Sequence, residues 1–333
     1  MPFLGDKMKE DAYMENFIAY FSDKFDFLNK KKFSNKGFLD IGHYYKHIDY
    51  VFLNWIEDLP DKRGGWIQSF LFIAMVYLFK AKRIKIIWVL HNKVTHYDSN
   101  RLLKGFLFRF IMRKCDYIIT HSREGLSYLD RFSTKYAEKA RYYAHPMKKK
   151  PLEFKTNPSV DILIWGSVIP YKGIHKFLQY LHENDLENRY RVLIAGKVKP
   201  KSYEKSIMDF CNDHIHLDNR YIPDEDLARY IADSKAILFT YVGDSVLSSG
   251  ILMISLAFGA NIIAPNVGAF KDAQEDGLIH TYETYADVAE LLNKNPGNQQ
   301  TRTAKIDTFI QDNTWSKFSQ RASSWIIESE QTL

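Results

Sequence analysis

The sequence predicts an α/β protein of two domains. Its second half alternates short apolar runs with segments of helical periodicity, which is the pattern of βαβ units joined by right-handed crossovers. Four consecutive apolar residues at 162–165 indicate a strand that is buried on both faces, as strands of parallel sheets are. The length of 333 residues allows two domains of ordinary size.

Charge is divided unevenly along the chain. Residues 1–150 contain 28 Lys and Arg against 16 Asp and Glu, a net charge of +12, whereas the remainder contains 18 against 24, a net charge of −6. We therefore expect the basic half to face something anionic, such as phosphates, nucleic acid or a membrane surface. Because no recognisable nucleic-acid-binding module accompanies this charge, nucleic acid is not the expected partner.

Three features bear on the compartment. Cys115 and Cys211 lie next to apolar residues in different halves and are expected to be buried thiols rather than a disulfide. The N-terminus lacks the pattern of a secretory signal. The most apolar run, 66–79, is too short to span a bilayer and is expected to be a buried or interfacial helix. These features predict a cytoplasmic protein, either free or attached peripherally to the inner face of the membrane.

Helices and strands are expected to alternate in the first half. The predicted helices are 12–21, 66–80, 101–114 and 122–132, and the predicted strands are 50–55, 84–90, 117–120 and 141–144, with weaker strands at 25–28 and 38–41. Ligands gather outside the carboxyl ends of parallel strands, and His91 directly follows the strand 84–90. His91 is therefore a candidate catalytic residue, although a loop histidine without a role would look the same.

The helix 101–114 interleaves basic and apolar side chains. With His96 before it, its residues Arg101, Lys104, Arg109 and Arg113 are candidates for contact with an acceptor or a membrane, since a basic amphipathic helix can lie on an anionic bilayer. A core-facing helix with a solvated basic side would show the same pattern. No metal site is expected, because His91 and His96 have no third ligand nearby.

Residues 147–160 carry two prolines and four lysines without periodicity and are expected to be a linker. The strands expected after it are 161–165, 191–195, 215–217, 236–241 and 261–265, and the helices are 173–183, 202–212, 225–233, 249–258 and 285–293. A last helix near 315–327 is expected to pack back on the first domain. The expected domains are therefore 1–150 and 151–314, followed by the helical segment 315–333.

Two turns of the second half suit an anion. Gly166 ends the strand 161–165, and Lys172 stands just before the next helix. Later, Ser248, Ser249 and Gly250 open an apolar helix, where a serine cap and small residues leave N–H groups open to a phosphate. An ordinary βα connection and a capped helix would explain each turn separately. Neither turn is a Walker loop or a GxGxxG fingerprint, so neither ATPase nor dehydrogenase activity is supported.

Nearly the whole chain resembles bacterial GT-B glycosyltransferases, either of the retaining-type family 4 or of a divergent exopolysaccharide-type branch. The first domain carries DYVFLNWIEDL, KIIWVLHNKVTH and DYIITHSREGLSYL, and the second carries IWGSVIPYKGI, VLIAGK, YIPDEDLARYIADSKAILFTY and SSGILMISLAFGANIIAPNVGAF. The resemblance implies two facing Rossmann-like domains. The second would hold a UDP- or GDP-sugar donor, and the first would hold a saccharide or lipid-linked acceptor.

The resemblance also assigns residues to the donor. Lys172 matches the family lysine on the diphosphate, and His91 matches a histidine near the transferred sugar. The other residues that match the family's donor site are Gly166, Tyr221, Ile222, Pro223, Ser248, Ser249 and Gly250. Ser167, Lys197 and Asp244 are further candidates for donor binding.

The chain departs from the family pattern at three positions. Ser167 replaces the family arginine, and Val246 and Ile254 replace both carboxylates of its paired-glutamate motif. Asp244 is a candidate substitute for the carboxylate that holds the ribose. These losses leave open whether the anomeric configuration is retained or inverted.

The resulting hypothesis is metal-independent sugar transfer in cell-surface polysaccharide biosynthesis, with no cofactor. One lysine and helix N–H groups would stabilise the charge on the departing diphosphate. For an inverting reaction, His91, Glu57 and Asp58 are the candidate bases, with His91 preferred. The alternative is a catalytically idle homologue that acts as a partner subunit, which the missing carboxylates permit.

Overall fold

The structure, a computed structural model, describes residues 12–29, 44–62, 64–93, 100–243, 247–293 and 299–331. The chain divides into two compact units. Met1–Pro146, Ser245–Ser248 and Asn313–Leu333 form the first unit, and Met147–Asp244 and Ser249–Asp312 form the second. The final segment of the chain thus belongs to the first unit.

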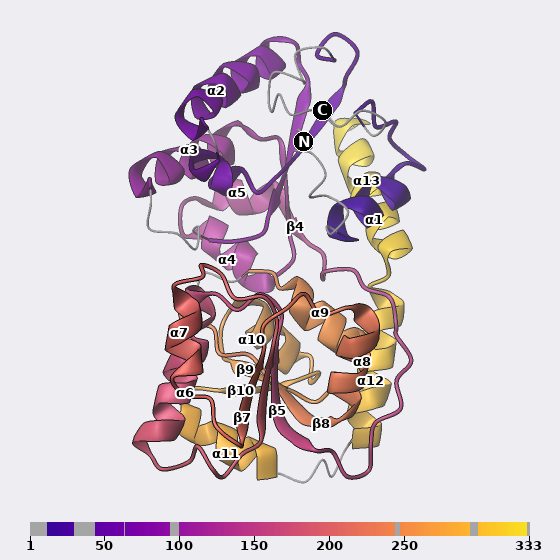
Figure 1. Cartoon of the computed structure of the whole chain (residues 1–333). Coiled ribbons are helices and arrows are strands. Elements are labelled where there is room, and N and C mark those ends of the chain that lie inside the picture. The colour runs from indigo at the N-terminus through magenta and orange to yellow at the C-terminus, as the bar shows by residue number, and fades with distance from the viewer. Residues whose placement is uncertain are drawn as a thin grey trace. The chain divides into compact units, whose positions relative to one another are not determined.

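The described part of the first unit contains a parallel sheet (Figure 1). Its strands follow the order β1-β2-β3-β4. The strands are β1 (Tyr50–Asn54), β2 (Lys85–Leu90), β3 (Tyr117–Thr120) and β4 (Ala140–Tyr142). Each crossover leads to the neighbouring strand, so all four carboxyl ends meet at one edge of the sheet. Residues that follow these strands are thereby brought together.

Helices cover both faces of this sheet. α2 (Gly65–Ala81) and α3 (Arg101–Lys114) pack against the side chains of Ile86 and Trp88 on one face. α1 (Ala12–Phe21) and α13 (Trp315–Gln331) pack against Ile87 and Val89 on the other. Alternate residues of β2 therefore enter opposite cores, which explains why its apolar run is continuous. The remaining short helices are η3 (Ile56–Asp61), α4 (Arg123–Asp130) and α5 (Thr134–Glu138).

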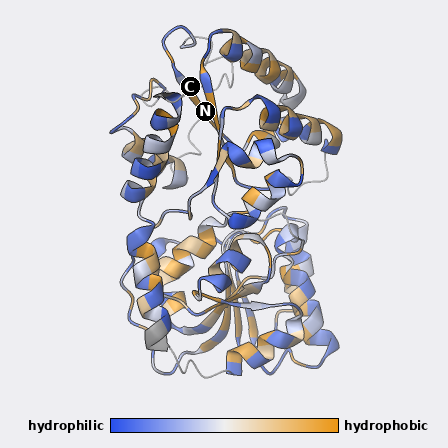
Figure 2. Ribbon diagram, turned by 180° about the vertical axis from the view of Figure 1, so that it is seen from behind, coloured by the Kyte–Doolittle hydropathy of each residue, from blue (hydrophilic) through white to orange (hydrophobic). Residues whose placement is uncertain are grey.

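The second unit is a doubly wound parallel sheet with the strand order β10-β9-β8-β5-β6-β7. Its strands are β5 (Val160–Trp165), β6 (Val192–Ala195), β7 (Ile215–Asp218), β8 (Ser234–Leu238), β9 (Ile262–Pro265) and β10 (His280–Tyr282). Its helices are η4 (Pro170–Lys172), α6 (Ile174–Glu183), α7 (Tyr203–Met208), α8 (Asp224–Ala232), α9 (Gly250–Ala257), α10 (Gly268–Glu275), α11 (Tyr285–Asn293) and α12 (Gln299–Asp312). Figure 2 shows hydrophobic residues concentrated in the strands and on the inward faces of the helices.

The segment expected to be a linker forms neither helix nor strand over 147–159, yet it is not free of the second unit. The backbone N–H groups of Lys150 and Lys155 donate to the carbonyls of Ala257 and Ala232. Lys149 and Lys150 also pair with Asp307 and Asp224. The segment is therefore held against α8 and α9 by main-chain hydrogen bonds and against α12 by an ion pair, none of which its composition reveals.

Most of the predicted elements lie where the periodicity indicated, with differences at some ends. The strand predicted at 25–28 is wrong, since these residues form turn and irregular chain beside the aromatic side chains of β1. The strand predicted at 38–41 lies outside the described residues. The structure adds α5, α10, β10 and α12, which the sequence did not indicate. Cys115 and Cys211 are both free thiols, and Cys115 is buried.

Candidate functional site

The second sheet has one topological switch point. The chain runs from β5 through β6 to β7 on one side and then crosses to β8 on the other side of β5. The loops that follow β5 and β8 therefore lead to helices on opposite sides of the switch point. In open α/β sheets, ligands bind at this place.

Two hydrogen bonds join these loops. Thr240 Oγ1 donates to the carbonyl of Lys172 at 2.6 Å, and the Val242 N–H donates to the carbonyl of Tyr171 at 3.2 Å. Gly173 makes this approach possible, because its φ is +67° and an added Cβ would clash with Val242 and lie 2.5 Å from the Thr240 carbonyl. The β5–α6 loop and the β8–α9 loop thus form one wall.

Lys172 is the central side chain of this wall. It is only 7% exposed, and no acceptor among the described residues pairs with its ammonium group. Its closest charge-stabilising contact is the ring of Tyr241, whose centroid lies 5.7 Å from Nζ. Burial lowers the pKa of Lys172 to about 7. A buried cation without a counter-ion is unfavourable unless an anion joins it.

The N-terminus of α9 reaches the same place. A Cβ built on Gly166 would lie 3.1 Å from Lys172 Nζ and 3.3 Å from Ile251 Cγ2, so these two side chains approach one point. Ser249 caps α9, since its hydroxyl accepts from the Leu252 N–H at 3.3 Å, and it is also hydrogen-bonded to Tyr241. Lys172 and the start of α9 at Ser249 and Gly250 are therefore neighbours within the second unit.

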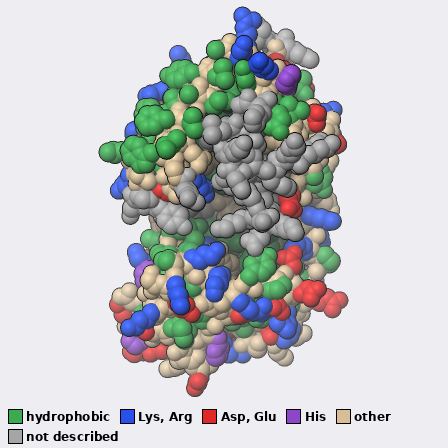
Figure 3. Space-filling model, turned by 45° about the horizontal axis from the view of Figure 1, so that its top comes forward, with side chains coloured by type: hydrophobic (Ala, Val, Ile, Leu, Met, Phe, Trp, Pro, Cys, Tyr) green, Lys and Arg blue, Asp and Glu red, His purple; other side chains and the backbone are tan. Residues whose placement is uncertain are grey.

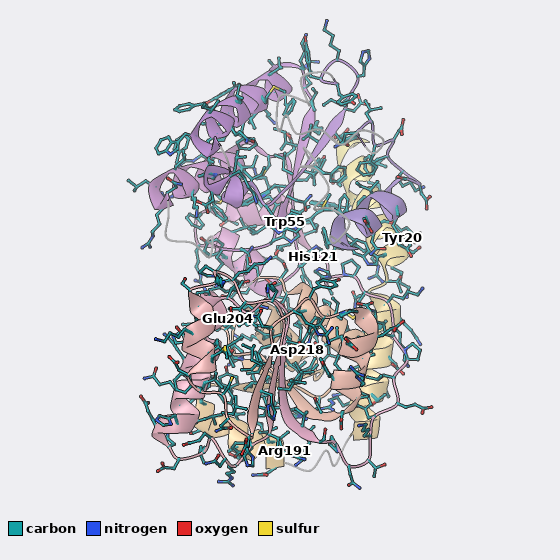
Figure 4. All side chains as sticks on the ribbon, viewed as in Figure 1. Tyr20, Trp55, His121, Arg191, Glu204 and Asp218 are labelled. Atoms are coloured by element: carbon teal, nitrogen blue, oxygen red, sulfur yellow. The ribbon has the colours of Figure 1, made fainter. Side chains whose placement is uncertain are left out.

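Several of the other residues assigned to the donor lie at the same edge of the second sheet. Lys197 follows β6 and is exposed, and residues 221–223 follow β7, with the Tyr221 ring 67% exposed. Figure 4 shows this edge at Asp218, the last residue of β7, while Arg191, just before β6, lies at the opposite edge. Ser167 and Gly250 are exposed, and Asp244 lies outside the described residues. Ser248 belongs to the first unit.

At the carboxyl edge of the first sheet, aromatic and imidazole rings form a buried cluster. His91, His121 and His145 follow β2, β3 and β4, and the Tyr13 ring touches all three with centroid distances of 5.2–5.6 Å. Trp55 follows β1 and stacks on His91 at 4.4 Å. Figure 4 labels Trp55 and His121 at this edge. Trp55 has a left-handed φ of 49°, a conformation that non-glycine residues adopt mainly at functional sites and tight turns.

Hydrogen bonds orient the three imidazoles. His91 Nε2 contacts Asn54 Oδ1 at 2.9 Å, and its Nδ1 lies 3.4 Å from Ser248 Oγ. His121 Nδ1 donates to the Tyr143 carbonyl at 2.8 Å, so its Nε2 accepts from the Tyr13 hydroxyl at 2.7 Å. These bonds engage both ring nitrogens of His91 and of His121. No group of three or more His, Cys, Asp or Glu in the described part of the chain is arranged to hold a metal ion.

Burial keeps this cluster uncharged. It lowers the pKa of His91 well below the ordinary value, with the proximity of His121 and His145 adding to the effect. Burial likewise lowers the pKa of His121 to about 3 and that of His145 to about 4. At neutral pH His91 is therefore in the form that can accept a proton, although a depressed pKa makes it a weak base.

The remaining first-unit candidates fall into two groups. Glu57 and Asp58 lie in η3 directly after β1, but the structure does not describe their side chains. His96 lies outside the described residues. On α3, Arg101, Arg109 and Arg113 are exposed, as a surface role requires. The prediction that Lys104 contacts an acceptor or a membrane is wrong. Lys104 is buried and pairs with Asp61 at 2.5 Å, because it faces η3 instead of solvent.

Sequence reasoning missed several residues of both sites. His121 and His145 each come within three residues of a strand end, as His91 does, and this shared position was the available signal. Thr240 and Tyr241 had no such signal, since both were read as part of a strand that in fact ends at Leu238. Tyr13 lies on α1, and nothing in its local sequence indicates contact with β2 or β3.

No protein-family model matches the sequence, and no curated protein sequence does either. Solved structures do resemble it. HepE of Anabaena, crystallised with UDP and glucose, aligns with a TM-score of 0.64 at 10% identity, over 92% of this chain and 85% of HepE. TarM of S. aureus aligns with a TM-score of 0.58 at 14% identity, over 90% of this chain and 59% of TarM.

A third likeness involves the catalytic domain of starch synthase IV from Arabidopsis thaliana, bound to ADP and acarbose. It aligns with a TM-score of 0.54 at 13% identity, over 84% of this chain and 73% of that domain. At such identities the likeness shows the fold. The GT-B fold class expected from the sequence, with two parallel-sheet units, is confirmed.

Proposed function

We propose that this chain is a glycosyltransferase that moves a sugar from a nucleoside diphosphate sugar to a hydroxyl group of a saccharide or lipid-linked saccharide. The donor is linked to UDP or GDP, and the product serves cell-surface polysaccharide biosynthesis. The second unit holds the donor and the first unit holds the acceptor. No metal ion or cofactor takes part.

Lys172 is the observation that carries this proposal. Its ammonium group is buried at the switch point of a doubly wound sheet, next to the capped N-terminus of α9, and has no counter-ion among the described residues. A diphosphate supplies the missing negative charge, and the exposed N–H groups at the start of α9 add hydrogen bonds. These groups take the place of the divalent cation that would otherwise neutralise a diphosphate leaving group.

In the reaction, the bond between the anomeric carbon and the diphosphate oxygen breaks, and a bond to the acceptor oxygen forms. The electron pair leaves with the diphosphate, where Lys172 stabilises the developing charge by a few kcal/mol. The acceptor hydroxyl loses its proton to a base. His91 is the assigned base because it is neutral and lies at the carboxyl edge of the first sheet. Glu57 and Asp58 are the alternatives.

The solved structures support the donor class. HepE was crystallised with UDP and with UDP-glucose, and the starch synthase domain was crystallised with ADP. The exposed Tyr221 ring after β7 offers a flat surface to the nucleotide base.

A thermal-shift series against UDP, GDP, ADP and their glucose conjugates tests the proposal. A ligand present at about 100 times its dissociation constant stabilises the folded state by about 2.7 kcal/mol. We expect one uridine or guanosine diphosphate to raise Tm, and the corresponding sugar nucleotide to be consumed when acceptor is present. If none of these nucleotides shifts Tm, the donor assignment is wrong.

A catalytically idle partner subunit is the second candidate, favoured by the apolar residues Val246 and Ile254 where relatives carry carboxylates. It predicts neither nucleotide binding nor hydrolysis of a sugar nucleotide. The same thermal-shift series, followed by an assay for released nucleoside diphosphate, separates the two candidates.

A further inference from the structure

Two neighbouring helices of the first unit expose an unusual amount of apolar surface. Six large apolar side chains on α2 and α3 are 51–93% exposed. These are Trp66, Ile67, Phe70 and Tyr77 on α2, and Leu102 and Phe106 on α3. Figure 3 shows hydrophobic side chains gathered on this part of the surface, with basic side chains around them. We refer to these six residues as the α2/α3 patch.

The two helices lie side by side and point in the same direction. At their N-terminal ends both meet η3, where Asn100 donates to the Pro60 carbonyl at 3.3 Å and Lys104 pairs with Asp61. At their C-terminal ends the rings of Tyr77 and Phe110 lie 5.7 Å apart, and Lys114 lies over the Tyr77 ring at 4.7 Å. The exposed side chains of both helices therefore belong to one continuous surface.

The charged residues of the two helices themselves are all basic, although Lys80 and Lys104 pair with Asp116 and Asp61 beside them. Neither α2 nor α3 contains an aspartate or glutamate. On α3, Leu102, Phe106, Arg109 and Arg113 are all exposed and lie within about 60° of one another around the helix axis. The exposed face thus begins with two apolar residues and continues with two arginines.

We infer that the α2/α3 patch docks on an anionic lipid bilayer. Apolar side chains enter the region between head groups and acyl chains, and the arginines contact the lipid phosphates. Trp66 suits the head-group level because its ring is amphipathic. A soluble protein partner would require a complementary acidic surface, whereas an anionic membrane supplies both the apolar phase and the negative charge. No described helix is long and apolar enough to span a bilayer, so the contact is peripheral.

The N-terminal ends of α2 and α3, which carry part of the α2/α3 patch, meet η3. Because η3 directly follows β1, the patch borders the carboxyl edge of the first sheet. A bilayer held there would lie next to the edge that carries His91. The docking itself does not depend on sugar transfer, and vesicle binding can be measured without substrates.

The experiment is flotation of the purified full chain with vesicles. Phosphatidylcholine vesicles with and without phosphatidylglycerol are compared at low and high salt. We expect flotation with the anionic vesicles, reduced by salt and weak with phosphatidylcholine alone. A double substitution, Arg109→Gln with Arg113→Gln, is expected to lower the partition coefficient about 30-fold, since each basic residue near the surface contributes about fivefold.

A second double substitution tests the apolar part. Phe70→Ser with Leu102→Ser is expected to lower partition at least about tenfold at low and high salt alike. The matched controls lie in the second unit. Met208→Ser removes an apolar side chain that is 56% exposed, and Lys176→Gln with Lys205→Gln removes two exposed cations. Both controls are expected to float like the unaltered chain.

Two results would overturn the inference. One is equal flotation of the patch variants and the controls, which would mean that general charge drives the binding. The other is a dimer that dissociates on Phe70→Ser with Leu102→Ser, measured by light scattering, which would assign the patch to a second copy of the chain. Circular dichroism of each variant verifies that the exposed substitutions leave the fold intact.

Discussion

The burial of Lys172 lowers the stability of the folded chain, and the proposed donor diphosphate would offset this cost. The pKa of Lys172 is about 7 in the folded chain and about 10.5 in the unfolded chain. Between these pH values the folded chain therefore binds fewer protons than the unfolded chain. The folded state is therefore penalised at every pH below 10.5, and the penalty is complete below about pH 7. A buried cation of this kind is retained at a binding site, because an anion relieves the penalty.

We predict that Lys172→Met separates stability from binding. The apolar side chain fills the same space without a charge, so the free energy of unfolding at pH 7 should rise by roughly 1–4 kcal/mol. Nucleotide binding should fall by at least tenfold. Denaturant unfolding and calorimetric titration with UDP and GDP measure the two effects.

Lys176→Met is the control for that prediction. Lys176 lies on α6, close to Lys172 in the chain, but is exposed, so its replacement should alter neither stability nor affinity noticeably. A Lys172→Met variant that binds nucleotide normally would contradict the proposed role of Lys172 in donor binding.

The buried histidines predict an acid-sensitive first unit. His91, His121 and His145 all have lowered pKa values, so below about pH 6.5 the unfolded chain binds protons that the folded chain excludes. The free energy of unfolding therefore carries no penalty from these histidines above about pH 6.5, and it decreases as pH falls below that value. Below pH 6.5 each histidine contributes about 1.4 kcal/mol per pH unit, so the three histidines should account for a loss of about 4 kcal/mol between pH 8 and about pH 5.5, in addition to the loss that Lys172 causes down to about pH 7.

Urea unfolding across this pH range measures that loss. His121→Phe should flatten the dependence by about one proton, whereas His182→Phe, which replaces an exposed histidine, should leave it unchanged. A pH dependence that is identical in His121→Phe would contradict the assignment.

Among the elements, the β5–α6 and β8–α9 loops decide the shape of the proposed donor site. Each is an ordinary connection by itself, but the bonds of Thr240 and Val242 to the loop of Lys172 make them one structure. Gly173 permits this contact, and its left-handed φ would strain any other residue except asparagine or aspartate.

We predict that Gly173→Ala lowers the free energy of unfolding by about 2 kcal/mol or more, because the added methyl meets the Thr240 carbonyl and the backbone conformation is unfavourable. Gly250→Ala is the matched control. A Cβ at Gly250 meets no atom within 4 Å, so its stability should be unchanged or slightly higher. Chemical denaturation of both variants provides the comparison, and equal effects would contradict the proposed loop contact.

For the whole molecule, the end of the chain completes the first unit. α13 supplies Trp315, Phe318 and Ile326 to the core beneath β1 and β2, together with α1. The second unit has its own core, in which Phe177 of α6 is buried. Each unit thus has a separate source of stability.

We predict that Phe318→Ala destabilises the first unit by about 3–5 kcal/mol, the usual effect of removing a buried phenyl ring. Hydrogen exchange should accelerate in β1–β3 and remain slow in β5 and β6. Phe177→Ala should do the reverse. Equal acceleration in both sheets would show that the units unfold as one.

The sequence predicted most of the alternating strands and helices well. A strand that is buried on both faces of a sheet is an unambiguous apolar run. The run at 84–90 became β2, and the basic helix at 101–114 became α3 with the same bounds. Prediction from the sequence failed where an element is too short to show periodicity, or where its apolar residues contact distant parts of the chain. α10 and β10 are short, and the segment 25–28 is apolar because it packs against β1 rather than because it is a strand.

The sequence by itself determined the fold class, the order of most elements and the two turns around Lys172 and Ser249, since periodicity and turn residues act locally. Only the tertiary structure decided that these turns meet, that Lys172 has no partner among the described residues, and that three histidines share one cluster with Tyr13. It also decided that Lys104 faces inward. The reason is physical: local sequence determines the backbone conformation, whereas burial and pairing depend on strands brought together from distant parts of the chain.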